Sequence, residues 1–279
     1  MTTAPPSESL ATPRRVASDV PFYVALAVLS GVYLLLLAAM VVAEASFTTP
    51  AHIWAALRSE EIQYAIKLSL LSCTMSTILS LWVAVPIGYV MSRFEFCGKT
   101  LVDAMLDVPI VLPPLVIGLA LLILFQTPMG RFIENHVMPV TFAIPAVVLA
   151  QFMVACAFAI RTMRVTFDQI SPRHEQVALT LGCTRSQAFW TVVLPQARRG
   201  ILAAATLAWT RAMGEFGPIL VFAGTTRMRT EVLPTSVFLE LQIGNVEAAV
   251  AVSLVMILAA LVVLVVVRLC GGDPLGRAL

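Results

Sequence analysis

Long apolar stretches alternate with short polar segments along most of the chain. A helix needs about 20 predominantly apolar residues to cross the hydrocarbon core of a bilayer. Six stretches reach that length, so we expect an all-α membrane protein with six transmembrane helices. They lie at residues 21–43, 65–91, 105–126, 140–161, 200–224 and 247–268.

Prolines fall inside the second and third of these stretches. Pro86 lies in the second, and Pro109, Pro113 and Pro114 lie in the third. A proline removes a backbone donor, and a membrane helix tolerates this where neighbouring helices satisfy the freed groups. The double proline therefore predicts a break that faces a pore or other helices, with a simple kink as the alternative.

The composition agrees with a membrane protein. The chain is 59% hydrophobic and 12% charged, with a mean hydropathy of +0.92, whereas soluble domains carry about 25% charged residues. Residues 1–20, rich in Pro, Ser and Arg and without a signal peptide, predict a disordered cytoplasmic tail. We expect one transmembrane domain over 21–270 and a short cytoplasmic tail over 271–279.

The basic residues predict the orientation. With the N-terminus in the cytoplasm, twelve Lys and Arg residues fall inside and four outside, and cytoplasmic loops are the ones enriched in Lys and Arg. The inside group is Arg14, Arg15, Arg93, Lys99, Arg161, Arg164, Arg173, Arg185, Arg198, Arg199, Arg268 and Arg277. The outside group is Arg58, Arg131, Arg227 and Arg229. Both termini are therefore expected in the cytoplasm.

A polar loop at about 165–197 separates the fourth and fifth stretches. Ser171-Pro172 is typical of a helix start, and Gly182 of a helix end. Thr184 with Gln187 matches a capping box. A second short helix should follow, burying Ala188, Phe189, Val192 and Val193 and ending at Pro195. The loop predicts two short amphipathic helices, which suit either an interfacial segment or a contact with a partner.

Arg211 and Glu215 are four residues apart inside the fifth stretch, so they share one helix face and can pair. Ionisable groups within a membrane helix are costly and usually face protein or water. Two interpretations stay open: a structural ion pair, or a pair beside a translocation path in which Arg211 attracts an anion. Gly214 and Gly217 would allow close helix approach or a gate that moves. Pro218 would break the helix there.

The sequence does not predict a metal, nucleotide, catalytic or nucleic-acid-binding site. Five scattered cysteines and three distant histidines do not predict a metal site. The tetrapeptide at Cys97–Thr100 lacks the glycine that a phosphate-binding loop needs five residues earlier, where Arg93 stands. No catalytic set is recognisable, and the basic residues do not gather into a nucleic-acid-binding patch. We expect no enzyme activity, no cofactor in this chain and no nucleic acid partner.

The polar loop resembles the cytoplasmic loop signature of ABC importer permeases. That signature reads Glu-Ala-Ala, three residues, Gly, nine residues and an Ile-x-Leu-Pro close. Here Gln176-Val177-Ala178, Gly182 and Leu194-Pro195 take those places, and Glu175 lies one residue before the position of the family's glutamate. The resemblance implies a type I permease fold whose coupling helices seat on an ATPase subunit, with Glu175, Gln176, Ala178, Gly182, Leu194 and Pro195 at or near the contact.

Two further segments resemble the oxyanion branch of this family, which carries molybdate, tungstate and sulfate. They are Pro86–Phe125 and Trp209–Gly224, the latter with the sequence Gly214-Glu215-Phe216-Gly217. The molybdate form is the most similar, because sulfate relatives more often have Tyr at the aromatic position. The resemblance implies a translocation path or gate at Arg211, Gly214, Glu215, Phe216, Gly217, Pro113 and Pro114.

The resemblance also implies the partners. A second copy of the chain would complete the path, a cytoplasmic ABC ATPase dimer would bind ATP and Mg²⁺, and an external binding protein would deliver the anion. The location would be a bacterial or archaeal plasma membrane. An ion-coupled secondary transporter, with Arg211 and Glu215 as a relay, is the alternative from a different class. No internal repeat supports that alternative.

Overall fold

The structure, a computed structural model, describes residues 19–271, with side chains described up to residue 266. The predicted tails lie outside this range except at their innermost residues. The chain divides into two compact units, Met1–Ser46 and Phe47–Leu279. The described part of the first unit is helix α1 (Val20–Phe47), which buries none of its residues. Such an apolar helix needs lipid or another helix around it.

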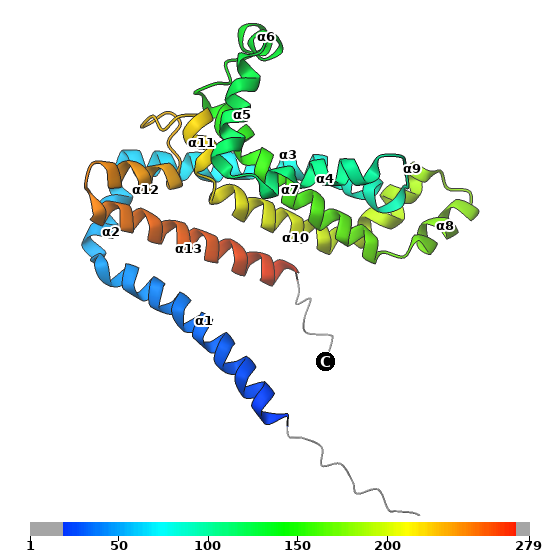
Figure 1. The fold of residues 1–279 in the computed structure, drawn as a ribbon, viewed down its shortest axis with the longest axis horizontal. Helices are drawn as coiled ribbons and strands as arrows, with labels where there is room; N and C mark the ends of the chain where they lie inside the picture. The colour runs from blue at the N-terminus through cyan, green and yellow to red at the C-terminus, as the bar shows by residue number, and fades with distance from the viewer. Residues whose placement is uncertain (1–18, 272–279) are drawn as a thin grey trace, which may run out of the picture. The chain divides into compact units, whose positions relative to one another are not determined.

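The second unit is also helical, and residues 19–271 contain no strand. Its long helices are α3, α7, α10 and α13, and the others are short (Figure 1). The elements are α2 (Pro50–Arg58), α3 (Glu60–Arg93), α4 (Lys99–Val111), α5 (Pro114–Gln126), α6 (Pro128–His136), α7 (Ile144–Gln169), α8 (Pro172–Thr180), α9 (Arg185–Ala188), the π-helix η1 (Phe189–Val193), α10 (Leu194–Met213), α11 (Gly217–Phe222), α12 (Leu233–Gln242) and α13 (Val246–Gly271).

Four helices are long and apolar enough to cross a membrane. They are Val20–Phe47, Glu60–Arg93, Ile144–Gln169 and Val246–Val266. A fifth crossing is possible if α4 and α5 together make one broken span, since they meet at an angle of 111°. These helices correspond to five of the six predicted stretches. Pro86 lies within α3, which continues through it.

The fifth predicted stretch is broken beside Pro218, as its sequence predicts. The predicted stretch at 200–224 is divided between α10, which ends at Met213, and α11, which begins at Gly217. Gly214 forms the C-terminal cap of α10, and Pro218 lies in the first turn of α11. Proline suits a first turn, where its missing N–H would have no helical partner. Pro218 therefore starts a helix, and the break lies just before it.

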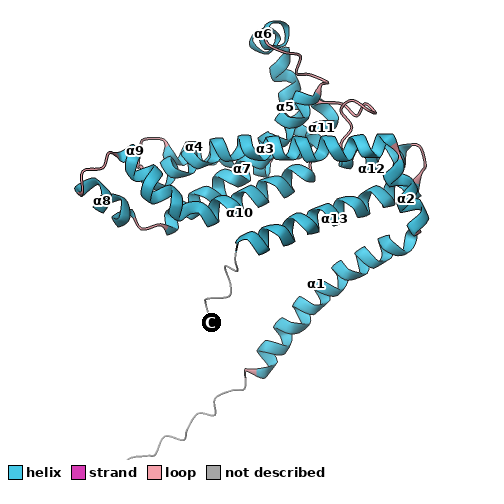
Figure 2. Cartoon of the chain, turned by 180° about the vertical axis from the view of Figure 1, so that it is seen from behind, coloured by secondary structure: helices cyan, strands magenta, loops and turns pink. Residues whose placement is uncertain are grey.

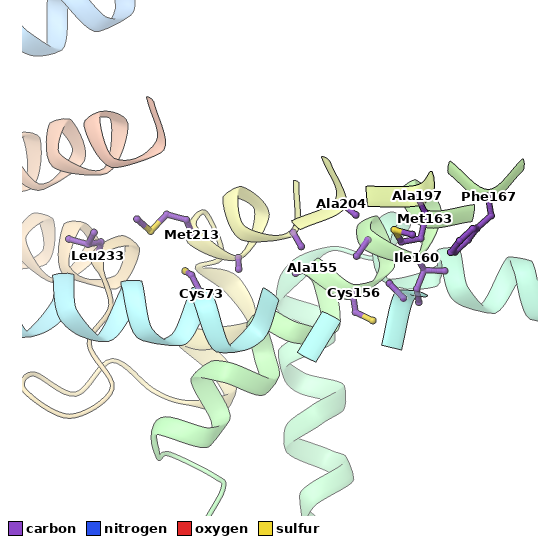
Figure 3. Packing of buried hydrophobic residues seen from close by; sticks show 14 of the residues in the cluster. Cys73, Ala155, Cys156, Ile160, Met163, Phe167, Ala197, Ala204, Met213 and Leu233 are labelled. Atoms are coloured by element: carbon purple, nitrogen blue, oxygen red, sulfur yellow. The ribbon is translucent and has the colours of Figure 1, made fainter. Parts of the chain in front are cut away.

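The core of the second unit is the packing of α3, α7 and α10. Small residues dominate it, among them Ala155, Ala197 and Ala204, all fully buried (Figure 3). A Cβ on Gly88 would lie 2.8 Å from the Cβ of Met163, so α3 and α7 approach closely at this point. Small side chains allow such contact between membrane helices, where van der Waals packing replaces the hydrophobic effect.

Two groups of short elements lie at opposite ends of these long helices. Helices α8 and α9 lie at one end, and α2 and α12 at the other, as both views show (Figures 1 and 2). The bent pair α4 and α5 projects α5 and α6 away from the long helices. The polar loop therefore lies far along the helices from α2 and α12.

Candidate functional site

The polar loop begins as its sequence predicts. Ser171 caps α8, its Oγ accepting a hydrogen bond from the Arg173 N–H at 3.4 Å. Thr184 and Gln187 form the expected capping box at the start of α9, with contacts of 3.3 and 2.8 Å. These local bonds satisfy amide groups that would otherwise have no helical acceptor. The two helix starts predicted at Ser171-Pro172 and at Thr184 are confirmed.

Gly182 ends α8 in the left-handed region, with φ +92°. Its N–H donates to the carbonyl of Leu179 at 3.1 Å, and the Cys183 N–H donates to the carbonyl of Ala178. A Cβ on Gly182 would meet no atom within 4 Å, so its backbone conformation, and not crowding, is what favours glycine here. Gly182 is the turn between α8 and α9.

The prediction that Pro195 ends the second short helix is wrong. Helix α9 continues through η1 into α10, and Pro195 lies in the first turn of α10. The N–H of Leu194 donates to the carbonyl of Phe189, five residues back, which is a π-helical bond. The wider π-helical turn lies just before Pro195, whose ring and missing N–H would disrupt a regular α-helix at this point. The expected burial is confirmed for Ala188 and Val193, which are fully buried, whereas Phe189 and Val192 are half-buried.

Helix α8 has two different faces. Glu175 and Ala178 are buried against the chain itself, with 8% and 7% of their surface exposed. The opposite face is exposed and partly apolar, since Val177 is 57% and Leu181 80% exposed. We call this exposed side the docking face, and it comprises Arg173, Gln176, Val177, Thr180, Leu181 and Gly182. Val177 and Leu181 lie four residues apart, so their side chains share one side of the helix.

This arrangement changes the role expected for Glu175 and Ala178. They were predicted at the partner contact, but they hold α8 against the rest of the chain. Tyr89 Oη donates a hydrogen bond to Glu175 Oε1 at 2.6 Å. Arg93 Nε lies 3.6 Å from Glu175 Oε2, and Arg93 Nη2 donates to the carbonyl of Ile170 at 2.7 Å. A buried carboxylate is stable when it is paired in this way.

Aromatic rings surround this contact. The ring of Tyr89 packs edge-on against Phe94, Phe167 and Phe189, with centroid distances of 6.2, 5.6 and 4.8 Å. These rings come from α3, α7 and η1 and from the residue after α3. Tyr89 is therefore held between the long helices and the polar loop.

The second candidate site lies where the two broken helices meet. A Cβ on Gly217 would lie 3.0 Å from the Cβ of Pro114 and 3.1 Å from the N of Leu115. One on Gly118 would lie 2.8 Å from the Cα of Pro218. The structure thus brings the predicted gate residues Pro114 and Gly217 into contact. Pro113 and Gly214 are exposed beside them, at the ends of the same breaks.

Arg211 and Glu215 pair across the end of α10. Arg211 Nη2 lies 2.7 Å from Glu215 Oε1, while Glu215 is only 1% exposed. The angle is outside hydrogen-bond geometry, so Oε1 has a charged neighbour but no directed donor in the described part of the chain. The Arg211 guanidinium also lies 5.5 Å from the ring centroid of Phe158, and Phe216 packs on Phe238. The predicted pairing is confirmed, although Glu215 lies beyond the last helical turn.

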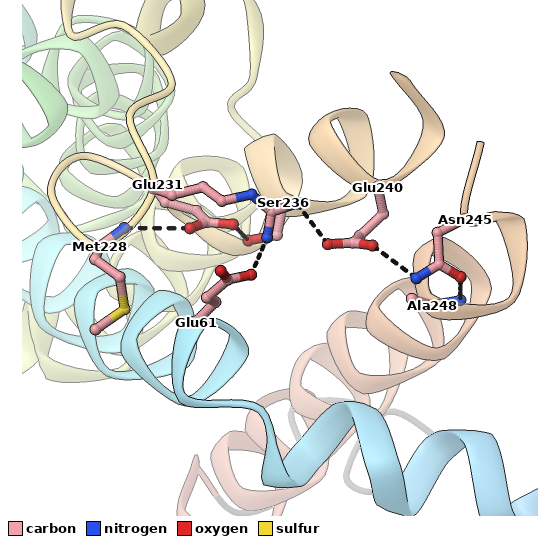
Figure 4. A network of polar contacts seen from close by, with 8 residues as sticks. Glu61, Met228, Glu231, Ser236, Glu240, Asn245 and Ala248 are labelled. Atoms are coloured by element: carbon pink, nitrogen blue, oxygen red, sulfur yellow. Dashed lines mark hydrogen bonds and ion pairs between the residues drawn. The ribbon is translucent and has the colours of Figure 1, made fainter. Parts of the chain in front are cut away.

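Sequence reasoning missed a network at the other end of the long helices. Arg227 pairs with Glu61 and, at 2.8 Å, with Glu240, and Asn245 donates to Glu240 at 3.0 Å (Figure 4). The hydrogen bond to Glu240 raises the pKa of Arg227 above its usual value. Arg227, Glu61 and Glu240 line a cavity of about 610 Å³ between α2, α3, α12 and α13. Residues so distant in sequence carry no spacing signal that links them.

Two ion pairs between α4 and α7 were missed as well. Arg161 pairs with Asp107, and Arg164 pairs with Asp103. The spacing of the charges, four residues in α4 and three in α7, was a usable signal, because each pair of like charges shares one helix face. In the sequence analysis, Arg161 and Arg164 contribute only to the predicted orientation in the membrane.

Comparison with known proteins identifies the family. Residues 84–271 match the family described as the binding-protein-dependent transport system inner membrane component. The Molybdenum transport system permease protein ModB of Mycobacterium tuberculosis is 33% identical over 250 residues, covering 88% of this chain and 94% of that protein. The Sulfate transport system permease protein CysT of Salmonella typhimurium is 32% identical over 216 residues, covering 77% and 78%.

The fold is shared with a solved transporter. A chain of the crystal structure of a bacterial alginate ABC transporter, in complex with an alginate pentasaccharide-bound periplasmic protein, superposes with a TM-score of 0.73. It is 16% identical, and the match covers 90% of this chain and 93% of that one. The family match extends over both broken helices and the polar loop, and it confirms the resemblance. The chain belongs to the binding-protein-dependent inner membrane components, the permease subunits of ABC transporters.

Proposed function

We propose that this chain is the permease subunit of an ATP-driven importer for a tetrahedral oxyanion. Molybdate is the first candidate, with tungstate and sulfate as the alternatives. Relatives named for molybdenum and for sulfate transport support the class of cargo. The observation that carries the transport mechanism is the docking face, because a short helix at the end of the long helices that exposes Val177 and Leu181 is suited to a protein partner.

The docking face would receive a cytoplasmic ABC ATPase, which binds the ATP and Mg²⁺. Pro195, exposed beside the half-buried Leu194 at the start of α10, would lie at the edge of this contact. A second copy of the chain would complete the translocation path, and an external binding protein would deliver the anion. In this arrangement both termini lie in the cytoplasm, as the distribution of basic residues predicts.

Transport would follow alternating access. Approach of the two ATPase subunits would draw the docking faces together, and hydrolysis would release them. The broken helices α4–α5 and α10–α11 are suited to a gate, because backbone breaks at membrane depth are tolerated where they line a cavity. Arg211 would offer positive charge near that path, and Phe216 and Gly217 would flank it.

The test is ATP hydrolysis by the reconstituted complex of this permease with its ATPase and binding protein, titrated with molybdate, tungstate and sulfate. Stimulation by one anion at far lower concentration than the others would establish the cargo. An assembled complex that hydrolyses ATP but responds to none of them would contradict the oxyanion assignment. Failure of an ATPase to bind would favour a secondary transporter instead.

The docking face has its own test at Gly182. Proline there would fix φ near −65° in place of +92° and would remove the N–H that bonds to Leu179. We expect Gly182→Pro to abolish ATP-driven uptake while the protein remains folded in the membrane. Gly182→Asn is the matched control, since asparagine tolerates the left-handed region. Uptake by the proline variant at the wild-type rate would rule out the docking assignment.

A further inference from the structure

A single buried carboxylate ties the docking helix to a transmembrane helix. Glu175 lies on the inner face of α8, while Tyr89 and Arg93 lie in the last turns of α3. The Tyr89 hydroxyl donates to Glu175 Oε1 at 2.6 Å, and Arg93 faces Glu175 Oε2. Residues 89 and 175 are 86 positions apart, so this contact exists only in the folded chain.

Arg93 also holds the connection between α7 and α8. Its Nη2 donates to the carbonyl of Ile170, the residue that caps the end of α7, at 2.7 Å. The same guanidinium therefore touches the start of the loop and the carboxylate of the docking helix. Its side chain is 9% exposed and that of Glu175 is 11% exposed, so water screens the contact only weakly.

The contact between Arg93 and Glu175 is incomplete. The two atoms, Nε and Oε2, are 3.6 Å apart, and Nε is a buried donor without a hydrogen bond among the described residues. A charge-assisted hydrogen bond would need a separation of about 2.8 Å. A movement of α8 toward α3 by less than about one ångström would form this bond, so the pair is sensitive to the position of the docking helix.

We propose that Tyr89, Arg93 and Glu175 couple the docking helix to α3, so that a displacement of α8 by the ATPase enters the membrane through α3. The covalent links of α8 lead to α7 and, through α9 and η1, to α10, and this side-chain contact supplies a direct link to α3. Helix α3 packs along both α7 and α10, so its movement reaches the helix that carries Arg211. Tyr89, Arg93 and Glu175 act as positioning residues. This inference rests on the proposed function.

The experiment measures the number of cargo anions imported per ATP hydrolysed by the full complex in proteoliposomes. Tyr89→Phe removes one hydroxyl and its bond to Glu175. Tyr64→Phe is the matched control, because Tyr64 lies at the other end of the same helix and loses one comparable bond, from its hydroxyl to the carbonyl of Arg229 at 3.0 Å. We expect Tyr89→Phe to lower the import ratio about fivefold, the equivalent of one hydrogen bond, and Tyr64→Phe to leave it unchanged.

Conservative variants separate coupling from folding. Glu175→Gln should lower the ratio as Tyr89→Phe does, and Glu175→Asp should restore part of it while the amount of assembled complex stays constant. Equal ratios in Tyr89→Phe, Glu175→Gln and wild type would overturn the proposal. If Tyr89→Phe prevents assembly, Arg93→Lys takes its place, because it keeps the charge and loses the guanidinium contacts. A wild-type complex that imports no oxyanion would instead contradict the proposed function.

Discussion

Glu215 is a carboxylate buried at the break between α10 and α11, with Arg211 as its one close cation among the described residues. A buried charge without a partner is strongly unfavourable, whereas the pair as a whole contributes little net stability. The two interpretations of this pair predict different results, because an ion pair that only holds the fold is replaceable by neutral residues of similar size.

We expect Arg211→Met to lower the free energy of unfolding by about 3 kcal/mol, since it leaves the buried Glu215 uncompensated. Glu215→Gln should lower it by less, because the Arg211 side chain is 32% exposed and keeps contact with water. The double variant should recover most of this stability. If Arg211 attracts the anion, the double variant will be stable but will not import it. Thermal unfolding in detergent measures the stability of each variant, and uptake in proteoliposomes measures its transport activity. A double variant that is stable and imports at the wild-type rate would establish a purely structural pair.

At the scale of elements, two helices are broken at matching places and touch there. Helices α5 and α11 meet through Gly118 and Gly217, each of which faces a proline of the other helix. The nearest atoms to a Cβ on Gly118 are backbone atoms of Pro218 at 2.8 and 2.9 Å, which cannot move aside as a flexible side chain can. This contact fixes the position of the short α11.

We expect Gly118→Ala to destabilise the protein by about 1–3 kcal/mol through overpacking and to slow uptake if the breaks form the gate. Gly31→Ala in α1 is the matched control, because a Cβ there meets nothing within 4 Å. The melting temperature and the uptake rate of the two variants are to be compared. Equal melting temperatures would show that α5 and α11 do not require this close contact.

At the scale of the whole second unit, polar contacts join distant segments at both ends of the long helices. Tyr89, Arg93 and Glu175 do so near α8, and Arg227 does so near α2 and α12. Arg227 bridges Glu61 of α3 and the nearly buried Glu240 of α12, whose Oε2 accepts from Asn245. Without the arginine, two carboxylates would lose their shared partner.

We expect Arg227→Gln to lower the free energy of unfolding by about 2 kcal/mol and to loosen α12 from α3. Arg229→Gln is the matched control, because Arg229 is exposed and its side chain makes no hydrogen bond or ion pair to another described residue. Hydrogen exchange of residues 233–242 measures the local effect, and thermal unfolding measures the global one. Similar exchange in the two variants would show that Arg227 does not hold α12.

The sequence by itself determined the membrane class, five of the helical stretches, the caps at Ser171 and Thr184, the turn at Gly182 and the pairing of Arg211 with Glu215. Each of these depends on residues within a few positions of one another, because helix periodicity and capping are local. Only the tertiary structure decided that the face of α8 with Glu175 is buried, that the helix continues past Pro195, and that Gly118 meets Pro218. Those features depend on helices far apart in sequence, whose packing selects one face of each helix and leaves the other exposed.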